Sequence, residues 1–177
     1  METKKFKIEN AHSKIEWIGR KVTGSHNGTI DIIDGTLDFE DGRLSGGLFT
    51  MDTTSIKILD VADAATNAQF AGHLASEDFF SSEKFPTATY TITAVTPNAG
   101  SQYHIEGDLT IRGITHPVAF DASVSSNGDT LTASGKIVLD RTKYDMKFRS
   151  GNFFKDLGDN LIYNDVNLNV RITAKAA

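Results

Sequence analysis

The sequence predicts an all-β protein whose antiparallel strands close into a barrel. Apolar residues occupy every second position along most of the chain, almost without interruption from residue 86 onward. A side-chain period of two is typical of strands with one dry face and one wet face. Short turn sequences separate these runs, which indicates an antiparallel meander. Because a long meander must hide its two edge strands, closure into a barrel is the expected solution.

Two strands are expected in the first forty residues. The first covers Ser13 to Val22 and buries Ile15 and Trp17. The second runs from about Gly28 to Glu40, and its apolar residues change face partway along. A change of face within one strand is what a β-bulge produces, so we expect a bulge there.

Turn sequences divide the rest of the meander. Asp41-Gly42 forms a tight hairpin into a third strand near Arg43 to Thr53. Later turns are marked by Pro97 to Gly100 and by Asn127 to Asp129. The strands that these turns separate are expected around the alternating runs Ala88 to Ala94, Tyr103 to Ile111, Val118 to Val124, Leu131 to Leu139 and Ile162 to Ile172.

One segment breaks the alternation and reads as a helix. Asp60 to Ser76 is rich in alanine and has no β-branched run, and Asp60 is the expected N-cap. The loop that follows, Ser76 to Pro86, carries three phenylalanines. Exposing three aromatic rings in one loop is costly, so we expect the loop to fold against the rim of the barrel.

Composition narrows the class of function. The chain has 177 residues, enough for one domain with a real core. Its net charge of -5 argues against nucleic acid as the main partner, since phosphate binding needs a strongly basic surface. There is no cysteine, which excludes disulfides, thiolate metal sites and cysteine nucleophiles.

Motifs for catalysis or metal binding are missing from the sequence. The five histidines are dispersed, with no spacing typical of a metal site. There is no nucleophile elbow, P-loop or dinucleotide fingerprint. Asp156, Asp159 and Asp165 form a loose acidic group, but their spacing matches no calcium loop and a surface loop is expected. We therefore expect no metal, no cofactor and no catalytic residue, although a lumen site built from one histidine and one carboxylate stays open.

Whether the barrel is filled or hollow decides its function. Small residues on the expected inner face would leave space in the lumen, but small barrels also alternate small and large residues to pack a tapering core. Strands of about 12 residues, tilted by about 40°, give a tube of roughly 30 Å, which suits a hydrocarbon chain. If the lumen is hollow, Ala122→Phe or Gly135→Leu should block ligand uptake. The small residues concerned are Gly19, Gly35, Gly46, Ala88, Ala94, Gly107, Ala122, Ala133 and Gly135.

Specific motifs carry a family resemblance. The order and spacing of the segments His12–Trp17, His73–Phe80, Lys84–Tyr90, Gly107–Val118 and Asp140–Tyr144 closely resemble the YceI family of lipocalin-like, polyisoprenoid-binding proteins. The resemblance spans essentially the whole chain, residues 1–177, as a single domain. It implies an extended eight-stranded antiparallel barrel around a long isoprenoid or fatty-acyl chain. It brings no catalytic residues with it.

Candidate binding residues fall into two groups. Each residue of the first group, taken singly, is better explained by ordinary core packing, and the basic residues of the second group by a solvated rim; the case for a ligand is collective. His73 is better explained by a structural bond to the loop that bears Asp78 than by a ligand contact, and His26 by a hairpin turn. The group expected around an apolar tail is Trp17, Phe49, Phe70, Leu74, Phe79, Tyr90, Ile92, Leu109, Phe120, Ile137, Phe148 and Leu168. The group expected near an anionic head is Arg20, Lys21, His73, Arg141, Lys143 and Arg149, because a closed barrel makes the first and last strands neighbours.

The expected function is binding, transport or storage of a long-chain apolar ligand in the lumen. Two alternatives stay open: a lipid-acting isomerase or hydrolase with a lumen site, and a stress-related interaction protein with a packed barrel. The expected partner is an isoprenoid or fatty-acyl lipid, with no nucleic acid and no integral membrane association; a homodimer stays open. Met1 to Asn10 lacks the apolar core of a signal peptide, so we expect a cytoplasmic location, or a periplasmic one if a signal peptide has been removed.

Overall fold

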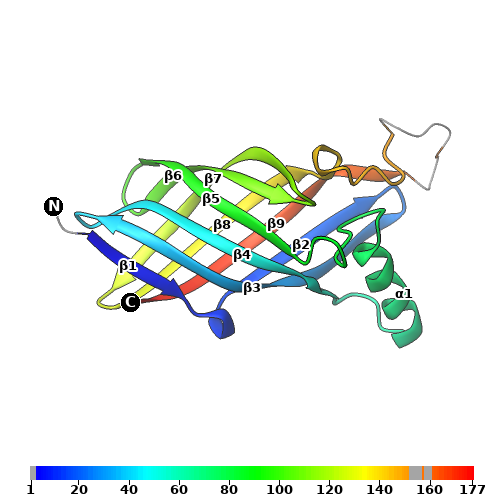
Figure 1. The fold of residues 1–177 in the computed structure, drawn as a ribbon, viewed down its shortest axis with the longest axis horizontal. Helices are drawn as coiled ribbons and strands as arrows, with labels where there is room; N and C mark the ends of the chain where they lie inside the picture. Colours follow the sequence, from blue (N-terminus) through cyan, green and yellow to red (C-terminus); the bar gives the residue numbers. More distant parts are fainter. Residues whose placement is uncertain (1–2, 152–156, 158–160) are drawn as a thin grey trace.

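The computed structural model describes residues 3–151, 157 and 161–177 as a closed antiparallel β-barrel with one α-helix (Figure 1). The predicted fold class is confirmed. The elements in chain order are β1 (Thr3–Ile8), η1 (Asn10–His12), β2 (Lys14–Lys21), β3 (Gly24–Glu40), β4 (Arg43–Ile58), α1 (Ala64–Ala75), β5 (Thr87–Pro97), β6 (Gln102–Ile111), β7 (Ile114–Asn127), β8 (Thr130–Asp140), η2 (Arg141–Tyr144) and β9 (Ile162–Ala176).

Nine strands occupy eight positions around the barrel. Both β1 and β2 pair with β3 and with β9, because the short 3-10 helix η1 interrupts what would otherwise be one long strand. Strand β1 is missing from the sequence prediction. Only two of its side chains, Phe6 and Ile8, are buried, so its alternation is too short to stand out from a polar N-terminal segment.

The bulge expected in the second strand is confirmed, and a larger irregularity was missed. The pairing of β3 with β4 shifts register between Ile32 and Asp34, where the apolar residues change face. A second shift leaves four residues of β4 after Asp52 unpaired with β3. There the Thr53 N–H donates to the Pro86 carbonyl at 2.9 Å instead. The expected end of this strand at Thr53 is therefore wrong, because the strand continues beyond the bulge to Ile58.

The helix is shorter than predicted. It begins after Asp63, whose carboxylate accepts a hydrogen bond from the Thr66 N–H at 2.9 Å. The predicted N-cap, Asp60, instead accepts from the Asn27 N–H at 3.2 Å and lies 2.9 Å from His26 Nδ1. The expected start was wrong because aspartate is a good N-cap residue at either position. Only Asp63 lies three residues before a backbone N–H of the first helical turn that needs an acceptor.

The antiparallel order gives the barrel two different ends (Figure 1). At the closed end lie the β3–β4, β5–β6 and β7–β8 hairpins, strand β1 and the C-terminus. At the mouth end lie the β2–β3 and β6–β7 hairpins, α1 with the loop after it, and η2 with the segment after it, residues 145–151. The loop after α1 folds inward as expected, since Phe79 is buried and neither Phe80 nor Phe85 is exposed.

Two of the small residues expected in the lumen face outward. Register shifts in β4 and β5 place Gly47 and Val95 inside, where Gly46 and Ala94 were expected. Several small positions that do face inward are covered by a large neighbour. A Cβ added to Gly107, for example, would lie 2.5 Å from the Tyr90 ring. Small inward residues therefore do not by themselves mark empty space.

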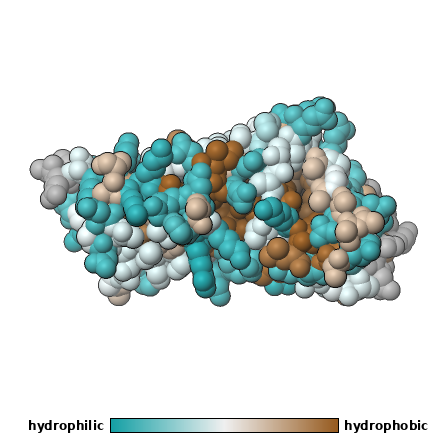
Figure 2. Space-filling view, turned by 90° about the horizontal axis from the view of Figure 1, so that it is seen from below, coloured by the Kyte–Doolittle hydropathy of each residue, from teal (hydrophilic) through white to brown (hydrophobic). Residues whose placement is uncertain are grey.

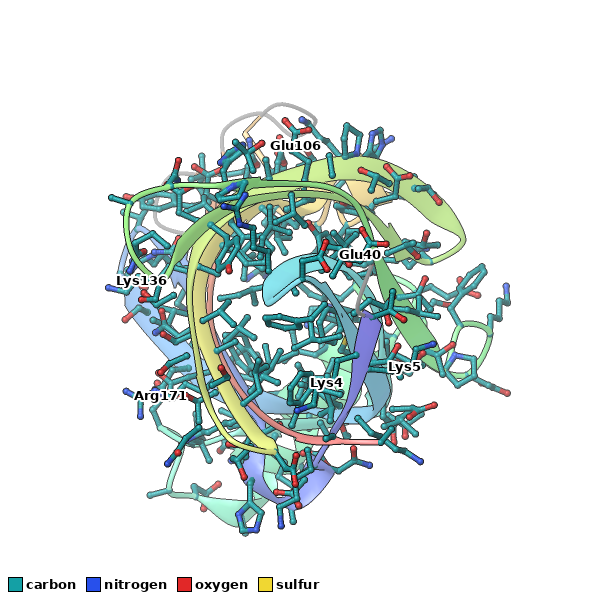
Figure 3. All side chains as sticks on the ribbon, turned by 90° about the vertical axis from the view of Figure 1, so that its left-hand side faces the viewer. Lys4, Lys5, Glu40, Glu106, Lys136 and Arg171 are labelled. Atoms are coloured by element: carbon teal, nitrogen blue, oxygen red, sulfur yellow. The ribbon has the colours of Figure 1, made fainter. Side chains whose placement is uncertain are left out.

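Charged side chains cover the outer wall. Viewed from the closed end, Glu106, Lys136 and Arg171 point away from the barrel (Figure 3). On the face seen from below, most of the surface is hydrophilic, and hydrophobic residues reach it in the middle and toward the α1 side (Figure 2). No described helix is long and apolar enough to cross a bilayer.

Candidate lipid-binding cavity

A cavity of about 600 Å³ occupies the mouth half of the barrel. This volume lies within the range of about 300–1,000 Å³ that is usual for small-molecule sites. Strands β2, β3 and β9 form much of its wall, while α1, the loop after it and the segment after η2 cover the end of the barrel. Gly19 lines the cavity, and a Cβ added there would meet nothing within 4 Å. The barrel is therefore hollow at this end.

A second, smaller cavity of about 90 Å³ lies deeper in the lumen. Its lining comes from every strand of the barrel except β1 and is almost entirely apolar. The two cavities share four lining residues, Ile15, Met51, Leu109 and Leu168, so they lie end to end. We call them the outer cavity and the inner cavity.

All twelve residues expected around an apolar tail line one of these cavities. Their contact with a ligand stays a prediction. Trp17, Phe70, Leu74, Phe79 and Phe148 line the outer cavity; Phe49, Tyr90, Ile92, Phe120 and Ile137 line the inner cavity; Leu109 and Leu168 line both.

Some residues that line the cavities were not predicted from the sequence. Ile56 lies in the irregular part of β4 and Met146 in the segment after η2, so neither belongs to a run with a clear period. His26 was expected to be a turn residue, but it lies within β3 opposite Gly19 and lines the outer cavity. That assignment was wrong because β3 begins at Gly24, four residues before its predicted start.

Basic side chains gather at the mouth of the outer cavity. Arg20, Lys21, His73, Arg141 and Arg149 line it as expected, whereas Lys143 does not. Among the described residues of this lining there is no Asp or Glu. The outer cavity therefore has a positive rim in a protein whose net charge is -5.

The backbone of Ile162 brings three of these cations together. Its N–H donates to the Arg149 carbonyl at 2.8 Å, and its carbonyl accepts from Arg141 Nη2 at 3.0 Å. Ile162 is also the register partner of Lys21 across the β2–β9 ladder. The first long strand and the segment before the last strand thus lie together at one mouth, and the role of their basic side chains in holding a head group stays a prediction.

Arg141 is built into the structure. Only 3% of it is exposed, and its guanidinium donates to the carbonyls of Tyr163, Met146 and Ile162. Burial lowers the pKa of Arg141 to about 10, although the nearby Asp140 carboxylate favours the charged form. The hydrogen-bond donors of Arg141 already hold η2 to the start of β9. Its main contribution to the mouth is therefore its positive charge, and not a side chain that is free to bind a ligand.

His73 makes the structural bond that was expected. Its Nε2 lies 2.9 Å from the Asp78 carboxylate. Its ring also packs edge-on against Phe79 and Phe148, at centroid distances of 5.0 and 4.7 Å. Arg149 stacks over the other side of this cluster, 5.0 Å from the centre of the Phe148 ring. His73 therefore ties the end of α1 to the segment after η2.

The described residues hold no group of His, Asp and Glu side chains suited to a metal ion. Asp156 and Asp159 of the loose acidic group lie outside the described residues. Asp165 pairs with Asp140 across the β8–β9 ladder.

Comparison with known proteins places this barrel in a family. The YceI-like domain profile matches residues 6–174. The protein YceI of Escherichia coli is 32% identical over 133 residues, a match that covers 74% of this chain and 65% of that protein. The chain thus matches slightly less than two thirds of the length of that relative.

Solved structures share the fold. BcnA from Burkholderia cenocepacia superposes with a TM-score of 0.76 at 22% identity, covering 95% of this chain and 99% of that one. A polyisoprenoid binding domain from Saccharophagus degradans superposes with a TM-score of 0.72 at 10% identity, covering 97% and 98%. With the family profile matching nearly the whole barrel, the chain belongs to the YceI-like family.

Proposed function

We propose that this protein binds a long-chain apolar molecule, of the polyisoprenoid or fatty-acyl type, and carries or stores it inside the barrel. The observation that supports this most is the outer cavity of about 600 Å³, which leads into an apolar inner cavity. The polyisoprenoid binding domain with the same fold adds support. A packed interaction barrel is disfavoured by the same volume.

Burial of the tail would supply the affinity. Removing apolar surface from water stabilises a complex by about 25 cal/mol per Å². A tail that buries about 400 Å² would gain about 10 kcal/mol, from which the costs of association and of ordering the chain are subtracted. With a cost of about 4 kcal/mol, the net gain of about 6 kcal/mol corresponds to a dissociation constant of some tens of micromolar before any polar contact is added.

The positive rim would orient the ligand. Arg20, Lys21 and Arg149 line the mouth, and none of them makes an ion pair with the described carboxylates. A carboxylate or phosphate head would find charge-assisted hydrogen bonds there. We therefore propose that the ligand enters tail first and leaves its head at the mouth.

A binding role fits the lining better than an enzymatic one. The lining histidines of the outer cavity, His26 and His73, each lie 2.9 Å from an aspartate, an arrangement that would suit a general base only if a nucleophile were paired with it. The Thr66 hydroxyl donates to Asp63 at 2.6 Å rather than to either histidine. The described lining therefore shows no pair of nucleophile and base of the kind that lipid hydrolysis needs.

The first test fills the outer cavity. Gly19→Leu places a side chain in its open space, so the variant should fold normally and lose at least tenfold in affinity for palmitate or farnesol. Binding is measured by calorimetry, and lipids that copurify are identified by solvent extraction and mass spectrometry.

The matched control is Gly72→Leu on α1, which also has open space around it but does not line the cavity. This variant should bind as the unmodified protein does. Full binding by Gly19→Leu, or no binding of any long-chain molecule by the unmodified protein, would refute the proposed function.

A further inference from the structure

On every strand that lines both cavities, the residues of the outer cavity lie nearer the mouth and those of the inner cavity lie nearer the closed end. On β9 the outer cavity touches residues between Ile162 and Leu168, and the inner cavity touches Leu168, Val170 and Ile172. On β6 the order is Leu109 and Ile111 for the outer cavity, then Ile105 and Leu109 for the inner one. Strands β2, β3, β4, β5 and β8 repeat this order. The inner cavity is therefore the continuation of the outer one toward the closed end.

The two cavities meet at a ring of shared residues. The four shared residues, Ile15, Met51, Leu109 and Leu168, come from β2, β4, β6 and β9 and so surround the lumen. Ile15, Met51 and Leu109 are all less than 9% exposed. Met51 has an unbranched, flexible side chain, which adapts its shape more readily than its neighbours. An apolar, flexible hydrocarbon chain suits this junction.

The inner cavity has a floor. Beyond it, toward the closed end, lie Phe6, Phe39, Tyr103, Leu131 and Ala174, each no more than 8% exposed. Leu131 and Ala174 have no exposed surface at all. The packed core therefore stops the lumen at a fixed depth.

We infer that the inner cavity is the subsite for the end of the ligand's apolar tail, and that its floor sets the longest chain the protein binds well. This inference rests on the proposed function. From Ile162 the outer cavity is roughly 15 Å deep and the inner cavity ends at roughly 25 Å, from about 3.3 Å per residue and a strand tilt near 40°. Chains that reach the inner cavity gain affinity from it, and chains longer than its floor allows gain nothing more.

This assignment changes the expected result of filling the lumen at Ala122 or Gly135. Both residues line the inner cavity and not the outer one. A larger side chain there should shorten the accepted chain, not block uptake altogether. Gly135→Leu is a poor test because its Cβ would lie 3.0 Å from the Phe120 ring.

The experiment measures the affinity of the protein for straight-chain fatty acids from octanoate to eicosanoate. In the unmodified protein, the affinity should rise about three- to fourfold for each added methylene and then level off at one chain length. Ala133→Leu fills the inner cavity and should move this length to a shorter chain, with no change for chains that end in the outer cavity. Ala122→Val is a milder second variant with the same expected direction.

The control is Ala94→Leu on β5, whose side chain faces outward. It adds the same leucine on the outer wall, away from both cavities, so it should leave the chain-length profile unchanged. If Ala133→Leu and Ala122→Val bind every chain as the unmodified protein does, the inner cavity is not the tail-end subsite, although the proposed function stands. If no chain of any length binds, the proposed function itself fails.

Discussion

At the scale of single residues, the two arginines near the mouth have separate tasks. Arg141 is buried and donates to three carbonyls, whereas Arg149 is exposed and stacks on Phe148. The first should determine stability and the second the choice of head group. Their contrast could not be predicted from the sequence, where both were equally plausible as head-group residues.

Paired substitutions separate these tasks. Arg141→Gln leaves buried carbonyls without donors and should lower the free energy of unfolding by about 2–4 kcal/mol. Arg149→Gln should change it by less than about 0.5 kcal/mol. Urea unfolding followed by circular dichroism gives both values.

The same two variants are compared in binding. Arg149→Gln should weaken palmitate about three- to tenfold and leave hexadecanol, which has the same chain and no charge, unaffected. An equal loss for the acid and the alcohol would show that Arg149 does not contact the head group.

At the scale of elements, α1 is a cover held by few contacts. It buries none of its own residues. Two histidine clusters fasten it: His26 packs edge-on against Phe70 at 4.8 Å and bonds to Asp60, and His73 packs against Phe148. An element fastened so lightly is expected to open more often than the barrel strands.

Loosening one fastening should speed ligand exchange. Because an edge-on aromatic contact contributes about 0.5–1.5 kcal/mol, His26→Ala should raise the rate of ligand release about three- to tenfold. Stopped-flow displacement of a fluorescent fatty acid measures this rate.

The matched control is His104→Ala, which removes a similar His–Asp pair on the outer wall, at 2.8 Å from Asp121. Its release rate should not change. If both variants release ligand at the rate of the unmodified protein, α1 does not limit exchange.

Strong acid should also speed ligand release. Burial opposes ionisation of Asp60, but the Asn27 N–H and His26 outweigh it, so the pKa of Asp60 lies below its usual value of 3.8. A carboxyl group with a lowered pKa stabilises the fold at neutral pH, and this contribution is lost as the pH falls through that lowered pKa. The fastening at His26 therefore persists at pH 5.

The existence of the long strands was predictable, whereas the short strand β1 and the register in β4 and β5 were not. Alternation over long runs, as in β6 and β9, indicates a β-strand and fits no other element. In β4 and β5 a bulge moves the inner face by one residue, which is why Gly46 and Ala94 were placed in the lumen in error. The bulge in β3 shows in the local pattern as a change of face, but the irregularity after Asp52 depends on a hydrogen bond from Thr53 to the distant Pro86, which the local pattern does not contain.

At the scale of the whole molecule, the barrel divides into a packed half and a hollow half. The sequence posed these as alternatives for the entire lumen, and the structure contains both. Alternation shows which side chains point inward, but it does not show whether opposite walls meet. That depends on which large residue leans over which small one, as Tyr90 does over Gly107.

Stability and binding should therefore respond to different halves. Leu131→Ala creates a cavity in the packed half and should lower the free energy of unfolding by about 2–5 kcal/mol, while affinity for palmitate is retained. Leu74→Ala borders space that is already empty, so it should cost less than about 1 kcal/mol and weaken binding instead. Denaturant unfolding and calorimetry on both variants test this division, which would fail if Leu131→Ala lost affinity as strongly as Leu74→Ala.

Strand β1 and the C-terminus lie at the closed end, where the Ala177 N–H donates to the Lys5 carbonyl at 2.9 Å (Figure 1). A fluorescent reporter or a sensor surface attached through the C-terminus would thus sit on the far side of the molecule from the mouth. Oriented immobilisation by the C-terminus would present every mouth to the solution, so this barrel suits a surface assay of the proposed ligand binding without redesign.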